Sequence, residues 1–226
     1  VGTKHAQHMA TLHPAFMQKS GVPCDVPVIG HGLAPVHETP ARRRLAGTAI
    51  PQGCEVAMVG NLGAVWTDWP VIAAMVARHP DRTFRLIGPL PDGPAPPALV
   101  RLQRAPNCIL TGRMSPDKIA AIGDDVAVWL IAFNDRVQGG PTDTHKMLEY
   151  LATGAPVLTS WLANWAGSDL VHMTARDGNA AMPGMLGQLL SLTEPDSLRR
   201  RRIDTALAAS YAARLDRIEA ILAGAP

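Results

Sequence analysis

The residues best suited to chemistry by type and spacing lie around position 145. Lys146 stands in the first turn of a predicted helix. The loop that leads into this helix carries glycines and hydroxyl groups, at Gly139, Gly140, Thr142 and Thr144. Glycine lets an anion approach the backbone, and a helix N-terminus offers unpaired N–H groups and a positive dipole end. The segment therefore predicts a phosphate site, with Lys146 within reach of a diphosphate.

Glu149 follows Lys146 by three residues, so both side chains point to the same helix face. A carboxylate beside a phosphate site can accept two hydrogen bonds from a ribose diol, as the acidic residue of dinucleotide-binding folds does. A plain surface ion pair explains the same spacing, and the two residues alone leave both interpretations open. Neither Gly-x-Gly-x-x-Gly nor Gly-x-x-x-x-Gly-Lys-Ser/Thr is present, which disfavours a hydride-transfer enzyme and a kinase-like ATPase.

The composition is that of a globular chain that is not built to bind nucleic acid. Of its 226 residues, 47% are hydrophobic and 18% are charged, and the net charge is +2. We predict that the arginine runs Arg42–Arg44 and Arg199–Arg202 are solvated faces rather than a DNA or RNA site. The three cysteines are far apart, as is typical of free thiols in a reducing compartment, so we expect a cytoplasmic protein. No Asp-x-Asp pair or His/Cys cluster at ligand spacing predicts a metal site.

Short apolar segments alternate with helical patterns along the chain. We expect strands at 56–59, 84–87, 108–110, 126–132 and 156–158, with shorter ones at 26–29 and 170–173. Helices are expected at 68–78, from Ser115 onward, and at 144–153, 182–192 and 196–222. Residues 35–53 resemble a linker and 90–97 a loop. The continuous apolar character of the strands predicts an α/β fold, a Rossmann-like doubly wound parallel sheet flanked by helices.

In an open parallel sheet, ligands bind outside the carboxyl ends of the strands. Four loops follow expected strands directly and concentrate glycine: 60–63, 88–89, 112–114 and 134–144. We therefore expect the site at this edge of the sheet.

The segment from Thr144 to Leu158, THKMLEYLATGAPVL, is the most specific in the chain. It resembles the Pro-x-Lys-x-x-Glu-Tyr-Leu-Ala-x-Gly-x-Pro-Val-Val segment of GT-B glycosyltransferases, which use nucleotide sugars to build polysaccharides and glycolipids. HPDRTFRLIGP at 79–89 is similar to the second strand of the donor-binding domain in that family. SYAAR at 210–214 is similar to its last helix. The resemblance runs from about Val26 onward and implies the C-terminal, donor-binding domain of the GT-B fold.

The resemblance also implies roles for particular residues. Glu149 would hold the ribose, and Lys146 would meet the diphosphate or the sugar. The preceding loop would cradle phosphate and sugar, the loop after the first strand would face the interdomain cleft, and two residues after the third strand would flank the base. The implied donor-binding set is Glu149, Lys146, His145, Thr144, Thr142, Gly140, Gly139, Gly60, Asn61, Gly63, Arg113 and Met114.

By the same resemblance, residues 1–25 would be a remnant of an N-terminal domain or the interdomain connection, and 26–205 the donor-binding domain. Residues 206–226 would form a helix that packs back towards the N-terminal domain. The implied reaction moves a sugar from a UDP- or GDP-linked donor to the hydroxyl of a saccharide or lipid-linked saccharide, without metal or separate cofactor. The intact enzyme would then contact the inner membrane face. Its general base would lie in the missing domain, so the fragment would bind nucleotide and turn over little.

Two departures from the family pattern keep other functions open. Many retaining members carry a second Glu eight residues before the first, where this chain has Pro141. A basic residue is common after the glycine of the first strand, where this chain has Asn61. A sugar-nucleotide epimerase on the same scaffold and a non-catalytic nucleotide-binding relative are the alternatives.

Overall fold

A computed structural model of the chain describes residues 29–134 and 144–223. Several predictions lie outside these ranges. They are residues 26–28 of the strand expected at 26–29, the domain remnant at 1–25, and the loop residues Gly139, Gly140, Pro141 and Thr142.

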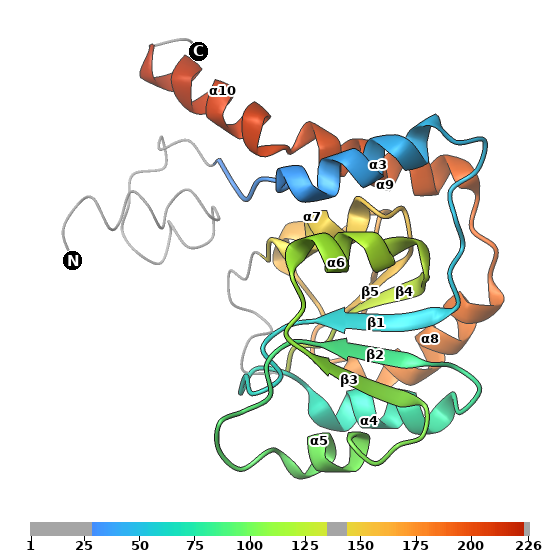
Figure 1. The fold of residues 1–226 in the computed structure, drawn as a ribbon. Coiled ribbons are helices and arrows are strands. Elements are labelled where there is room, and N and C mark those ends of the chain that lie inside the picture. The colour runs from blue at the N-terminus through green and yellow to red at the C-terminus, as the bar shows by residue number, and fades with distance from the viewer. Residues whose placement is uncertain (1–28, 135–143, 224–226) are drawn as a thin grey trace.

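A six-stranded parallel sheet lies at the centre of the described residues (Figure 1). Its strands are β1 (Glu55–Val59), β2 (Phe84–Ile87), β3 (Cys108–Gly112), β4 (Val126–Ile131), β5 (Val157–Thr159) and β6 (His172–Met173). They run in the order β3-β2-β1-β4-β5-β6, and every pair is parallel. The strand order therefore reverses between β1 and β4, which is the switch point of a doubly wound sheet. The predicted fold class is confirmed.

The central strands are buried on both faces, as their continuous apolar runs predicted. Val56, Ala57 and Leu130 are completely inaccessible to solvent. Burial on both faces needs a layer of helices on each side of the sheet, and the structure has two such layers.

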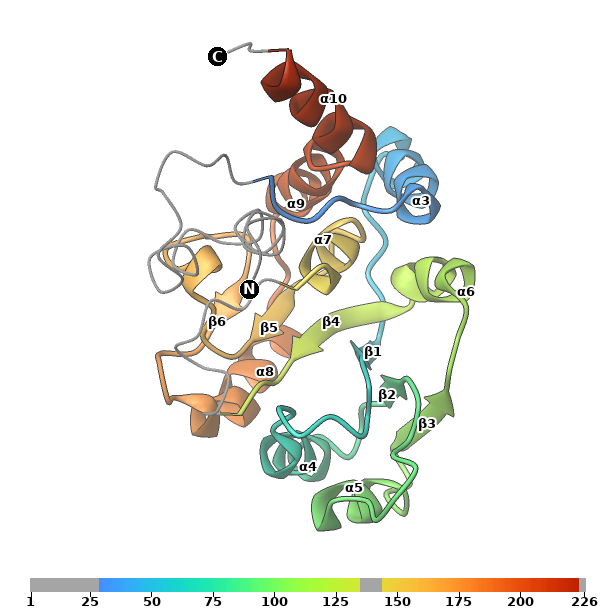
Figure 2. The same cartoon turned by 90° about the vertical axis from the view of Figure 1, so that its left-hand side faces the viewer.

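Figure 2 shows the two helical layers. One face of the sheet is covered by α4 (Trp69–Arg78), α5 (Pro97–Leu102) and α8 (Met182–Ser191). On the opposite side lie α6 (Pro116–Ala121) and α7 (Lys146–Leu151), with α3 (Pro35–Ala46) and α9 (Asp196–Ala208) farther from the strands, and α10 (Tyr211–Leu222) extends away from them. None of the helices in the described ranges is long and apolar enough to cross a membrane.

Helix α3 occupies a segment that we predicted to be a linker, so that prediction was wrong for 35–46. Pro35 suits the first turn of a helix because its missing N–H would be unpaired there anyway. The buried face of α3 consists of His37, Ala41 and Arg44 at helical spacing. Since two of these three are polar and Pro40 interrupts the pattern, a search for hydrophobic periodicity misses the helix.

Two further helical boundaries differ from the predictions. Helix α5 was not expected after the proline-rich loop. The single helix expected at 196–222 is divided into α9 and α10. The hydroxyl of Ser210 begins the second helix by accepting a hydrogen bond from the Ala213 N–H at 3.2 Å. At this break Leu33 lies between the two helices, accepting from the Tyr211 N–H at 3.1 Å and donating its own N–H to Ala209 at 2.8 Å.

The prediction that the arginine runs are solvated faces was wrong for three side chains. Arg44, Arg199 and Arg202 are only 4%, 4% and 0% exposed. Each is buried with partners, because an unpaired buried charge is costly. Arg44 donates to Asp124 at 2.6 Å, and Arg202 donates to Glu194 at 2.8 Å.

Candidate functional site

Helix α7 begins at the carboxyl edge of the sheet, beside the switch point, and Tyr150 fixes its position. The Tyr150 ring stacks on Trp129 of β4 with 4.3 Å between centroids. Its hydroxyl accepts a hydrogen bond from the N–H of Val59, the last residue of β1, at 2.8 Å. Gly154 then turns the chain into β5 with a φ of 75°, in the left-handed region that favours glycine. One buried side chain thus ties α7 to both central strands.

Lys146 extends from the start of α7 over Gly60, the first residue after β1. A Cβ atom on Gly60 would lie 4.0 Å from Cε of Lys146. Burial lowers the pKa of the Lys146 amine, while the nearby carboxylate of Glu149 acts in the opposite direction. The structure therefore brings together three residues of the predicted set that two separate segments supply.

Backbone hydrogen bonds of two glycines hold the strand ends together where Gly60 lies near Lys146. The Gly60 N–H donates to Ile87 at 2.9 Å, and the Gly88 N–H donates to Gly112 at 2.9 Å. These bonds join the ends of β1, β2 and β3. Gly88 has a φ of 145°, and a Cβ atom there would overlap the carbonyl oxygen of Gly60.

Asn61 and Gly63 shape the loop that follows β1. The Asn61 side-chain oxygen accepts a hydrogen bond from the Gly63 N–H at 2.9 Å, which closes a tight turn. A Cβ atom on Gly63 would lie 3.0 Å from Pro91. The geometry shows a turn-forming task for these two residues, and their part in donor binding stays a prediction.

Two imidazole rings flank the carboxylate of Glu149. Nε2 of His145 lies 3.8 Å from its Oε1 atom, and Nε2 of His37 lies 4.0 Å from the same atom. Burial raises the pKa of Glu149, and the positive charge of Lys146 opposes this rise. The side chain of Glu149 keeps 18% of its surface exposed. It therefore retains access for a ligand although it is flanked on one oxygen.

His37 is the residue of this site that sequence reasoning missed. It belongs to α3, which was interpreted as a linker. The available signal was the helical spacing of His37, Ala41 and Arg44, which form the buried face of that helix. His31 contacts His145 edge to face, with 5.9 Å between the ring centroids.

Comparisons with known proteins agree with this architecture. No family model matches the chain, and no curated protein matches its sequence. Among solved structures, HepE of Anabaena in complex with UDP and glucose matches 97% of this chain and 66% of its own length, with a TM-score of 0.65 and 13% identity. AviGT4, a glycosyltransferase involved in avilamycin A biosynthesis, matches 95% and 64%, with a TM-score of 0.65 and 17% identity.

Sucrose-phosphate synthase of Thermosynechococcus elongatus matches 96% of this chain and 56% of its own, with a TM-score of 0.65 and 13% identity. The chain has the fold of the C-terminal domain of GT-B glycosyltransferases. It spans between 56% and 66% of the length of these three proteins. At such identities the likeness is one of fold, and the predicted GT-B architecture is confirmed at that level.

The structure also describes three other residues of the predicted set, Thr144, Arg113 and Met114. Thr144 is buried two residues before α7, and its carbonyl accepts a hydrogen bond from the Met147 N–H at 3.1 Å. Arg113 and Met114 follow β3 on the same carboxyl edge, and β2 separates that strand from β1. Their contact with a base stays a prediction. Among the described residues, no cluster of three potential metal ligands is present.

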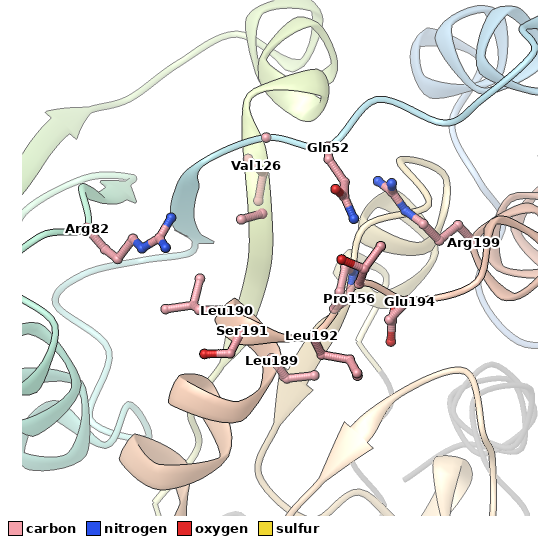
Figure 3. A pocket seen from close by; sticks show the side chains of 13 residues that line it. Gln52, Arg82, Val126, Pro156, Leu189, Leu190, Ser191, Leu192, Glu194 and Arg199 are labelled. Carbon is pink, nitrogen blue, oxygen red and sulfur yellow. The ribbon is translucent and has the colours of Figure 1, made fainter.

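The pocket shown in Figure 3 lies at the opposite, amino edge of the sheet in this GT-B fold. Val126 begins β4 there and Pro156 precedes β5. Its volume is about 140 Å³. Arg199 in its wall already donates to the Ile50 carbonyl at 2.9 Å, and Glu194 is paired with Arg202. The pocket is a small gap between partnered side chains on the edge where such sheets do not bind ligands.

Proposed function

We propose that this chain is the donor-binding half of a glycosyltransferase that moves a sugar from a nucleoside-diphosphate sugar to an acceptor hydroxyl. The observation that carries the proposal is the reach of Lys146 over Gly60, beside a partly buried Glu149, at the switch point of the sheet. A cation beside a glycine suits a diphosphate, because glycine lets an anion approach the backbone, and a carboxylate next to the cation suits a ribose diol.

The proposed mechanism rests on stabilising the leaving group. When the bond from the sugar to the diphosphate breaks, negative charge develops on the diphosphate oxygen. The Lys146 ammonium would stabilise this charge in a place largely shielded from water, where electrostatic interactions are stronger than in bulk solvent. Glu149 would orient the nucleotide by accepting two hydrogen bonds from the ribose hydroxyls. The donor would be UDP- or GDP-linked.

We also propose that a preceding domain completes the enzyme. It would supply the acceptor subsite and, in an inverting enzyme, the general base. The acceptor would be a saccharide or a lipid-linked saccharide, met in the cytoplasm or at the inner membrane face. Helix α10 supports the idea of a missing neighbour, because one of its faces exposes large apolar side chains, at Tyr211, Leu215, Ile218 and Leu222.

Calorimetric titration of the chain with UDP, GDP and ADP tests the proposal. We expect one diphosphate to bind. We expect Glu149→Gln to weaken that binding about tenfold, since hydrogen bonds to charged groups are worth more than neutral ones. The matched control is Glu219→Gln, which removes an exposed carboxylate on α10 and should bind as the wild type does.

Two outcomes would count against the proposal. Absence of binding by all three diphosphates would favour a non-catalytic relative that keeps only the fold. Equal affinity of the wild type and Glu149→Gln would mean that the carboxylate does not hold the ribose.

A further inference from the structure

Helix α3 brings a buried histidine to the carboxylate that the proposed function assigns to the ribose. Nε2 of His37 lies 4.0 Å from Oε1 of Glu149. That separation is about 1 Å longer than a hydrogen bond, so a small movement of the carboxylate closes it. The two residues come from different elements, α3 and α7, which lie on the same side of the sheet (Figure 1).

His37 differs from the other imidazole beside Glu149 in how firmly it is held. His145 keeps 54% of its side chain exposed and belongs to the same turn as the carboxylate, at i and i+4. His37 is 5% exposed, and its neighbours on the same helix face, Ala41 and Arg44, are buried as well. A ring packed in this way cannot change rotamer freely. It therefore offers Glu149 a fixed point of contact.

The anchoring of α3 makes this contact rigid. Nε of Arg44 donates to Asp124 at 2.6 Å, and its two terminal nitrogens lie 3.4 Å from the carbonyl oxygens of Ala120 and Ala152. Ala120 belongs to α6, and Ala152 ends α7. One guanidinium thus locks the helix that carries His37 to the helix that carries Glu149.

The charge state of His37 suits a partner for a carboxylate that must stay available. Burial lowers the pKa of His37, and the electrostatic interactions with Arg44 and His145 lower it further. The ring is therefore neutral at pH 7 and carries one N–H group. With the proton on Nε2, the ring can donate to Oε1 without forming a full ion pair, which leaves the other carboxylate oxygen for a ligand.

We propose that His37 is a positioning residue of the nucleotide site, whose imidazole holds the Glu149 carboxylate in the orientation that accepts a ribose diol. This inference rests on the proposed function. It adds that α3, which is not one of the loops that follow the strands, contributes to the affinity for the ribose hydroxyls.

The test compares UDP with 2′,3′-dideoxy-UDP, which lacks both ribose hydroxyls. Calorimetric affinities are measured for the wild type, His37→Leu and His37→Gln. We expect His37→Leu to weaken UDP binding about tenfold and to leave the dideoxy nucleotide unchanged, because only the diol uses Glu149. His37→Gln should recover much of the loss, since its terminal amide can donate to the same oxygen.

Arg42→Ala is the matched control, because Arg42 lies on the same helix with 65% of its side chain exposed. It should bind both nucleotides as the wild type does. If His37→Leu does not fold, His37→Met replaces it, because methionine is apolar, adapts to irregular space and cannot donate a hydrogen bond, and the same loss for UDP alone is expected.

The inference is overturned if His37→Leu weakens both nucleotides equally, since that is the effect of a purely structural residue. It is also overturned if His37→Leu keeps wild-type affinity for UDP while Glu149→Gln loses it, and in that case the proposed function stands. If the wild type binds neither nucleotide, the proposed function fails and the inference fails with it.

Discussion

Gly88 determines how closely the ends of β1 and β2 approach each other beneath Lys146. Its φ of 145° is a conformation that residues with a Cβ rarely adopt, and the space where a Cβ would lie is taken by the Gly60 carbonyl oxygen. Backbone cannot yield as the tip of a long side chain can. Any larger residue must therefore push the two strand ends apart.

We expect Gly88→Ala to lower the free energy of unfolding by more than about 2 kcal/mol, through backbone strain and steric overlap together. Gly93→Ala is the control, because nothing lies within 4 Å of the Cβ position at Gly93. It should change stability by less than about 0.5 kcal/mol. Urea unfolding monitored by circular dichroism measures both variants, and similar losses in the two would contradict the assignment.

The sequence reveals only part of the candidate site at this scale. Lys146 and Glu149 stand out because spacing within one helix fixes which side chains share a face. The same spacing does not tell which residues other elements bring alongside. The nearness of Gly60 and His37 depends on how β1 and α3 pack against α7, so it became visible only in the folded chain.

At the scale of elements, an arginine rather than a stripe of apolar residues attaches α3 to the neighbouring helices α6 and α7. Arg44 reaches α6 and α7 through one guanidinium, while the adjacent Arg43 stays 67% exposed and donates to Oδ2 of Asp124 at 2.6 Å. Substitution of each arginine in turn therefore compares the contribution of a buried guanidinium with that of an exposed one, and both contact Asp124.

We expect Arg44→Ala to destabilise the chain by about 3 kcal/mol, since it leaves the buried side of α3 without its hydrogen-bonding partner and leaves a gap. Arg43→Ala should cost less than about 1 kcal/mol, as exposed ion pairs contribute little. Thermal and urea unfolding of the two variants provide the measurement. The interpretation of α3 fails if Arg43→Ala is the more damaging change.

The elements that sequence patterns predict well are those held by burial of apolar residues. The five main strands were expected from their continuous apolar runs, and the structure has each of them within a residue or two. Helix α3 was not predicted because its buried face is largely polar. Helix α5 was not predicted because Pro97–Leu102 is too short to show the hydrophobic periodicity of a helix. Both cases show packing of polar or short segments that only the tertiary structure decides.

At the scale of the whole molecule, α10 is joined to the rest of the described chain near its start, where Nε of Arg214 donates to the His31 carbonyl at 3.0 Å. It has no buried residue, and its apolar side chains recur at the spacing of a single helix face, as at Leu215 and Ile218. In Figure 1 the helix extends away from the layers around the sheet. The preceding helix α9 behaves differently, because Ile203 is completely buried in the core.

If the apolar face of α10 packs against a preceding domain, it contributes nothing to the stability of this chain. We therefore expect the free energy of unfolding of the double variant Leu215→Ser, Ile218→Ser to differ from that of the wild type by less than about 0.5 kcal/mol in urea unfolding. Ile203→Ala is the contrasting variant and should cost about 2–5 kcal/mol, because it opens a cavity in the core. A large loss in the double variant would mean that α10 packs on part of this same chain. The exposed face would then be no argument for a missing neighbour, and the proposed completion of the enzyme by another domain would have to rest on the fold comparison alone.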